Sequence, residues 1–223
     1  MRPVLFATLL VVGALQCAGT NSQTCPLYGD VDGDGHADAV WVAQRSTCAF
    51  DLVVRTTARR LRAAIPAPSC TGKQSAFWAS KFPRVIALRP MNAHRGLEPE
   101  VLMWSGASND GIRFYTVWRG HLQPMRIHPE PFPKDEWNVG GFAAAFSETD
   151  CLRPHVLGRA GAWYDLHRWH LTGEVYRITA TAFVRTKFRA RRTRKLATDI
   201  WPYVRGDEFR HCGGVVRAYS PDP

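Results

Sequence analysis

The sequence predicts an all-β fold, in which propeller-like or blade-like antiparallel hairpin units form a single disulfide-bonded domain. Three observations favour it. Long helical periodicity is nearly absent, short runs of β-branched and aromatic residues alternate with Gly, Pro, Asn and Asp, and three stretches of the chain look alike. The chain is also long enough for one domain with its own hydrophobic core.

The predicted strands follow one another at short intervals along the chain. Turn signals such as Asn109-Asp110-Gly111 and Thr172-Gly173 separate them. In chain order the predicted strands are Ala37–Ala43, Phe50–Arg55, Arg60–Ile65, Arg84–Leu88, Glu100–Trp104, Ile112–Trp118, Leu122–Ile127, Phe142–Phe146, His155–Gly158, Trp163–Trp169 and Glu174–Phe183.

Three stretches share one order of elements. They begin with DAVWV at 38–42, PEVLMW at 99–104 and PHVLGR at 154–159. Each continues with an aromatic-rich strand, a basic turn and a further apolar strand. The units lie roughly 55–60 residues apart, a period typical of blades or stacked sheet units. Chance similarity among β-hairpins is the alternative explanation.

The sharpest motif is the stretch DVDGDGHAD at residues 30–38. Alternating carboxylates let a tightly wound loop turn them toward one point, and the glycines permit backbone angles that other residues resist. Such hard oxygen ligands are what Ca²⁺ requires. A metal-free acidic turn is the alternative, which mutual repulsion of the carboxylates disfavours. We predict a structural Ca²⁺ held by the side chains of Asp30, Asp32, Asp34 and Asp38 and by the backbone carbonyl, not the ring, of His36.

The loop departs from an EF-hand, because Trp41 stands at the twelfth position, where a bidentate Glu belongs, and a strand pattern follows. The stretch GDVDGDGHADAVWV at 29–42 resembles the FG-GAP, or VCBS, repeat of integrin-α-like propellers and exported bacterial proteins, including secreted actinobacterial ones. The resemblance implies one such domain over 24–223, with calcium stiffening a loop between two strands of a blade. The second and third units lack the Asp-rich loop, and three blades are fewer than known propellers have.

The N-terminus has the layout of a secretory signal peptide. Arg2 precedes an apolar run at 4–12 and the small residues Gly13 and Ala14. We predict a signal over 1–18, with cleavage between 14 and 20, and a secreted, extracellular or cell-envelope protein. The apolar run is too short for a transmembrane span. A lipid anchor at Cys17 is disfavoured because Ala14 and Gln16 fit a lipobox poorly.

The cysteines of an exported chain are disulfide candidates. Proximity in the sequence favours Cys48–Cys70, and Cys151–Cys212 would then tie the last third of the chain together. Cys25 is left over and could pair with Cys17 if that residue survives processing.

The formal net charge of +10 favours attraction to polyanions. The excess of Arg over Lys has a second explanation, a GC-rich genome. The densest basic run could bind a polyanion, with Phe188 available for stacking, or could be a solvated strand end or loop. Because no nucleic-acid-binding signature accompanies it, we do not expect nucleic acid as a partner. The run consists of Arg185, Lys187, Arg189, Arg191, Arg192, Arg194 and Lys195.

The tryptophans divide into two groups by their surroundings. Four lie in apolar strand patterns and are predicted to pack in the core: Trp104, Trp118, Trp163 and Trp169. Trp137, beside Glu136, and Trp201, beside Pro202, are predicted at the surface, where tryptophans could line a sugar site.

The sequence indicates no catalytic machinery. It lacks a Gly-x-Ser-x-Gly nucleophile setting, a recognisable Cys-His pair and an isolated carboxylate pair. His167 and His170 would point to opposite faces of a predicted strand and so would not share a metal. We therefore expect a secreted or cell-envelope calcium-binding β-repeat protein, a non-enzymatic module for an extracellular or cell-wall ligand. The alternatives are a secreted hydrolase with a loop-borne active site and a polyanion-binding surface protein that uses residues 185–195.

Overall fold

The computed structural model describes residues 26–46, 48–66, 83–92, 94–106, 109–131, 134–142 and 145–194, together with 209, 212 and 216–217. Every regular element within these ranges is a strand, which confirms the all-β prediction. Among these residues no helix has the length and apolar character to cross a membrane. The predicted signal peptide, Cys17, Cys25, Cys70, Lys195 and Trp201 lie outside the described residues.

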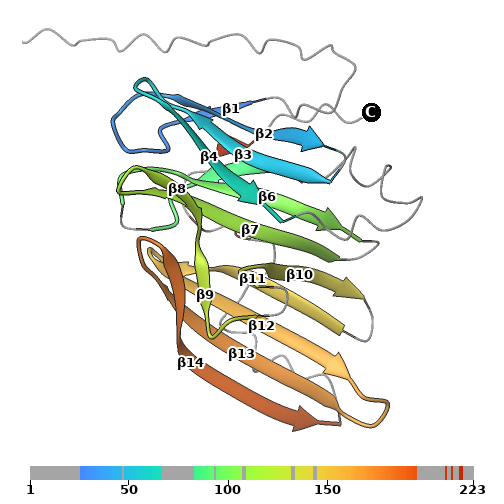
Figure 1. The fold of residues 1–223 in the computed structure, drawn as a ribbon. Coiled ribbons are helices and arrows are strands. Elements are labelled where there is room, and N and C mark those ends of the chain that lie inside the picture. Colours follow the sequence, from blue (N-terminus) through green and yellow to red (C-terminus); the bar gives the residue numbers. More distant parts are fainter. Residues whose placement is uncertain are drawn as a thin grey trace, which may run out of the picture.

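The strands form two sheets (Figure 1). The smaller is a four-stranded antiparallel meander of β1 (Leu27–Gly29), β2 (Asp38–Ser46), β3 (Ala49–Arg55) and β4 (Arg60–Ile65), paired in that order. The larger has eleven strands in the order β15-β5-β6-β7-β10-β11-β12-β13-β14-β9, with β8 also paired to β7. Its strands are β5 (Arg84–Arg89), β6 (Glu98–Ser105), β7 (Asn109–Trp118), β8 (His121–Pro124), β9 (Arg126–His128), β10 (Trp137–Phe142), β11 (Ala145–Arg153), β12 (Val156–Tyr164), β13 (Trp169–Ile178), β14 (Ala182–Thr193) and β15 (Val216–Arg217).

The chain runs through three antiparallel meanders, β1–β4, β5–β8 and β11–β14. They are not separate units, because β10 pairs with both β7 and β11 and so joins the second meander to the third. Neither a closed barrel nor a propeller is evident in the described strands. The antiparallel sheets are established, and the arrangement as blades stays a prediction.

The third predicted unit was placed wrongly. Residues 163–169, which were expected to form one strand, instead form the end of β12, a turn and the start of β13. The Asp165 carboxylate accepts the backbone N–H groups of His167 (3.0 Å) and Arg168 (2.7 Å), and this side-chain capping makes the turn. The expected turn at Thr172-Gly173 lies inside β13, where these residues pair with Gly161 and Ala160 of β12.

Three further predicted boundaries were also wrong. The expected strand 122–127 divides at Met125 into β8 and β9, and β9 leaves to pair in parallel with β14. The expected strand 174–183 divides at a turn in which the Thr179 hydroxyl accepts the Ala182 N–H at 3.0 Å. The expected strand 142–146 spans the connection from β10 to β11.

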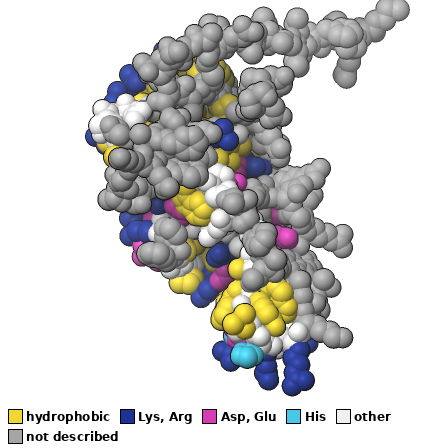
Figure 2. Space-filling model, turned by 90° about the vertical axis from the view of Figure 1, so that its right-hand side faces the viewer, with side chains coloured by type: hydrophobic (Ala, Val, Ile, Leu, Met, Phe, Trp, Pro, Cys, Tyr) yellow, Lys and Arg dark blue, Asp and Glu magenta, His cyan; other side chains and the backbone are white. Residues whose placement is uncertain are grey.

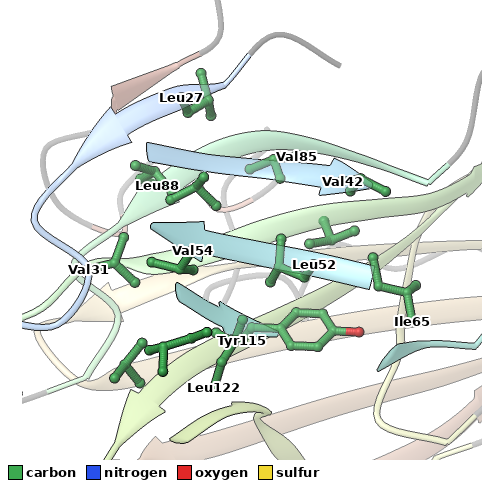
Figure 3. Packing of buried hydrophobic residues seen from close by; sticks show 14 of the residues in the cluster. Leu27, Val31, Val42, Leu52, Val54, Ile65, Val85, Leu88, Tyr115 and Leu122 are labelled. Atoms are coloured by element: carbon green, nitrogen blue, oxygen red, sulfur yellow. The ribbon is translucent and has the colours of Figure 1, made fainter. Parts of the chain in front are cut away.

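Strands β6 and β7 separate two hydrophobic cores. Val101 and Tyr115 face the first core, which the four-stranded sheet covers, whereas Leu102 and Phe114 face the second. This burial on both faces explains the nearly continuous apolar runs of the two strands, which show little alternation. Figure 3 shows Leu52 and Val54 of β3 within the first core, together with Val85 and Tyr115 of the larger sheet.

The tryptophan prediction is wrong for Trp137 and Trp163, whereas Trp104 and Trp169 are partly buried against hydrophobic clusters. Trp137, expected at the surface, is 1% exposed. Its ring lies against Tyr176, Phe183 and Phe209 at centroid distances of 5.0, 5.2 and 6.5 Å. Trp163, expected in the core, is 48% exposed. The reason is position in the sheet: β10 lies at the centre of the sheet, and Trp163 lies near the outer end of β12.

Candidate metal centre

The loop between β1 and β2 is wound around the Asp30 carboxylate. Its Oδ1 accepts the Gly33 N–H at 2.7 Å, and its Oδ2 accepts the Gly35 N–H at 3.0 Å. Both glycines have left-handed backbone angles, with φ of 81° and 88°, which side chains resist. The sequence therefore contains the residues that this winding needs.

Three of the predicted ligands are brought together. Asp30, Asp32 and Asp38 each offer a carboxylate oxygen, and these three atoms lie within 4.8 Å of one another. No other group of three or more metal-ligating side chains occurs among the described residues. Like charges at this separation repel, and a hard divalent cation bound between them would offset this repulsion by attracting each carboxylate.

Asp38 gives the cluster a feature that an ordinary acidic turn lacks. Its side chain is fully buried, and its Oδ2 accepts the N–H groups of Val31 (2.9 Å) and Asp32 (3.2 Å). Its Oδ1 is buried and has no hydrogen-bond partner. Burial raises the pKa of the Asp38 carboxyl, against the two N–H donors that lower it. A buried acceptor without a partner is costly, and a bound cation would supply the missing one, so the residues present fit Ca²⁺.

Asp34 and His36 lie outside this group of three. Asp34 is exposed, and its carboxylate accepts the His36 N–H (2.8 Å) and the Thr57 hydroxyl (3.0 Å). These two donors, the backbone N–H first, lower the pKa of the Asp34 carboxyl. The His36 ring is largely exposed and lies 3.3 Å from Asp34. The predicted roles of the Asp34 carboxylate and the His36 carbonyl as ligands stay predictions.

The β5–β6 connection supports the loop from the other sheet. The Leu97 N–H donates to the Asp30 carbonyl at 2.8 Å. A Cβ on Gly96 would lie only 2.1 Å from the Val31 carbonyl oxygen, so that only glycine allows this approach. Sequence reasoning missed this support because it comes from residues about 65 positions away.

The described part of the basic run lies on β14 and at its end. Arg185 is partly buried and pairs with Glu174 at 2.7 Å. The remaining described cations, Lys187, Arg189, Arg191, Arg192 and Arg194, are exposed. Because neighbouring residues of a strand point to opposite faces, Arg191 and Arg192 cannot belong to one flat patch. Polyanion binding through this run stays a prediction.

The disulfide predicted between Cys151 and Cys212 is present, with an S–S distance of 2.04 Å. It joins β11 to the C-terminal segment. Cys48 is disulfide-bonded as well, and its predicted partner Cys70 lies outside the described residues.

Glu98, close to this support, is a buried carboxyl that the sequence did not single out. It is 1% exposed, and its Oε2 accepts the N–H groups of Met91 (2.8 Å) and Asn92 (3.4 Å). Burial raises the pKa of Glu98 to about 8, despite these donors. The folded protein therefore holds a proton here at neutral pH that the unfolded chain releases.

We expect Glu98 to make stability fall as pH rises. Between the unfolded pKa of 4.5 and the folded pKa of about 8 the native state binds more protons than the unfolded state, so the free energy of unfolding decreases across that window. In urea unfolding from pH 5 to 8, the free energy of unfolding of Glu98→Gln should decline less than that of the wild type, by roughly 3–4 kcal/mol. The exposed Glu130→Gln should keep the wild-type slope. Parallel curves for wild type and Glu98→Gln would contradict the assignment.

Comparison with known proteins adds no assignment: no family model, no curated protein and no solved structure matches the chain. The candidate metal centre therefore rests on the motif and on its geometry.

Proposed function

We propose that the protein is an exported calcium-binding β protein that serves as a non-enzymatic binding module outside the cell or in its envelope. The observation that carries the calcium site is the buried Asp38, which has an unpartnered carboxylate oxygen and belongs to the same cluster as Asp30 and Asp32. The signal-like N-terminus and the Cys151–Cys212 disulfide support an oxidising, extracytoplasmic setting.

The calcium would be structural. The loop connects β1 to β2 in the smaller sheet and receives the Leu97 N–H from the larger sheet. Ordering the loop would therefore fix the edge of one sheet against the other. The three antiparallel meanders are compatible with blade-like units of the FG-GAP type, and the first would be the one that calcium stiffens.

Calcium should stabilise the protein through this loop. With Ca²⁺ at about a hundred times its dissociation constant, we expect a gain of about 2.7 kcal/mol and a correspondingly higher Tm. Asp38→Asn should abolish the calcium-dependent shift, because the amide keeps the shape and removes the buried charge. Thermal unfolding with Ca²⁺, with Mg²⁺ and with chelator measures the effect.

Glu130→Gln is the matched control, since it neutralises an exposed carboxylate elsewhere and should leave the shift intact. Calorimetric titration with Ca²⁺ gives the stoichiometry, for which we expect one ion per chain. A wild-type Tm that does not respond to Ca²⁺ would show that the loop is an acidic turn and would remove the main support for this function.

A further inference from the structure

Exposed apolar side chains gather at the outer end of the β12–β13 hairpin. Leu166 at its apex is 82% exposed, Trp163 is 48% exposed and Tyr164 is 38% exposed. We call residues 163–170 the distal tip. Figure 2 shows hydrophobic side chains grouped at one end of the molecule, with Lys, Arg and His side chains beside them. A cluster of this kind on the surface of a protein marks an interaction site.

Contacts within the distal tip hold its side chains in fixed positions. The Asp165 carboxylate caps the turn and pairs with His170 Nε2 at 2.5 Å. The His170 ring stacks on the Trp163 indole with 3.7 Å between centroids and 7° between planes. On the other face the Tyr164 hydroxyl donates to the Leu166 carbonyl at 3.2 Å. The apolar side chains are thus held in place before any partner arrives.

The requirements of folding do not explain why a leucine stands at position 166. Its φ of 71° lies in the left-handed region, where Asn or Gly is favoured and a leucine is strained. Its side chain packs little against the protein, as its exposure shows. A strained, exposed leucine at an apex suggests that its contacts are made with something else.

The charge around the tip is positive. Arg168 in the turn and Arg192, the cross-strand neighbour of His170, are both exposed. The single carboxylate of the tip, Asp165, is engaged by His170 and by two backbone N–H groups, which lower its pKa. The tip therefore presents cations beside an apolar apex.

We propose that the distal tip docks on an anionic lipid surface. Leu166 would enter the boundary between headgroups and acyl chains, Trp163 and Tyr164 would lie at headgroup level, and Arg168 and Arg192 would contact lipid phosphates. Trp and Tyr favour that depth, and a basic rim is attracted to anionic headgroups.

The shape favours a lipid surface over a polysaccharide. The most exposed side chain is aliphatic and stands at an apex, which can penetrate a planar interface but cannot enclose a sugar. A sugar would stack on an open aromatic face, and one face of Trp163 is already covered by His170.

Vesicle cosedimentation in excess Ca²⁺ tests the proposal. The wild type should bind phosphatidylcholine vesicles that contain phosphatidylglycerol, bind pure phosphatidylcholine vesicles much more weakly, and lose affinity as salt is raised. Leu166→Asn should lower the partition coefficient about tenfold. Arg168→Gln with Arg192→Gln should lower it about 25-fold, at about fivefold for each charge.

Folding and specificity are controlled in the same assay. Asparagine tolerates the left-handed backbone, so Leu166→Asn should keep or raise the Tm, and a loss of binding would not reflect misfolding. Leu152→Asn, which changes an exposed leucine of β11, should bind like the wild type. Equal binding by Leu166→Asn and wild type, no binding to anionic vesicles, or retention on an acidic polysaccharide without vesicle binding would overturn the proposal.

Discussion

Trp137→Ala is expected to lower the free energy of unfolding by about 3–5 kcal/mol, a large share of the stability of a domain of this size. The indole is 1% exposed at the start of β10, in edge-to-face contact with Tyr176, Phe183 and Phe209. Alanine would remove these contacts and leave a cavity that the sheet on either side of β10 cannot close. Urea unfolding monitored by far-UV circular dichroism measures the change.

Two variants separate packing from other effects of losing a tryptophan. Trp137→Phe keeps most of the ring and removes an indole N–H that is buried without a partner, so it should destabilise far less than alanine. Trp163→Ala changes the exposed tryptophan of the distal tip and should cost less than about 1 kcal/mol. Equal losses for Trp137→Ala and Trp163→Ala would contradict the burial assigned to the two rings.

These two tryptophans also show where sequence reasoning stops. Hydrophobic runs and turn residues located β3 and β4 almost to the residue, because both strands are short and bounded by local signals. Burial depends on where a strand lies within the sheet, and pairing between distant segments decides that. Trp137 follows the charged residues Asp135 and Glu136 in the sequence, but it lies on a central strand. Trp163 lies in an apolar sequence, but its strand extends beyond the second core at that point.

The candidate metal centre could likewise be predicted from the sequence only in part. Asp30, Asp32 and Asp38 could be predicted because one short stretch of sequence carries all three carboxylates. The burial of Asp38 and the close approach of Gly96 to Val31 could not be predicted, since they arise where the two sheets meet. The turn at Asp165 had a local signal, an Asp followed by residues whose N–H groups it can cap, but the nearby Thr172-Gly173 pair resembled a turn more closely.

Removing the Cys151–Cys212 disulfide is expected to cost about 4 kcal/mol. The bond closes a loop with a sequence separation of 61, and in the chain-entropy model a loop of that length gives about this loss when it is opened. The bond also holds the C-terminal segment, from which the fully buried Phe209 enters the second core beside Phe114 at 4.8 Å. The measurement is urea unfolding of the double variant Cys151→Ala, Cys212→Ala under oxidising conditions, which leave the disulfide of Cys48 intact.

The disulfide and Trp137 should also prove to be coupled. Phe209 contacts the Trp137 ring, and its N–H donates to the Thr149 carbonyl at 2.9 Å, so an anchored C-terminal segment is part of the packing around the indole. Once the segment is released, Trp137→Ala removes fewer contacts, and the combined loss should fall short of the sum by about 1 kcal/mol or more. Additive losses would mean that Phe209 stays in place without the disulfide. In that case the bond would stabilise the protein only by restricting the unfolded chain, and Phe209 would be held by the core alone.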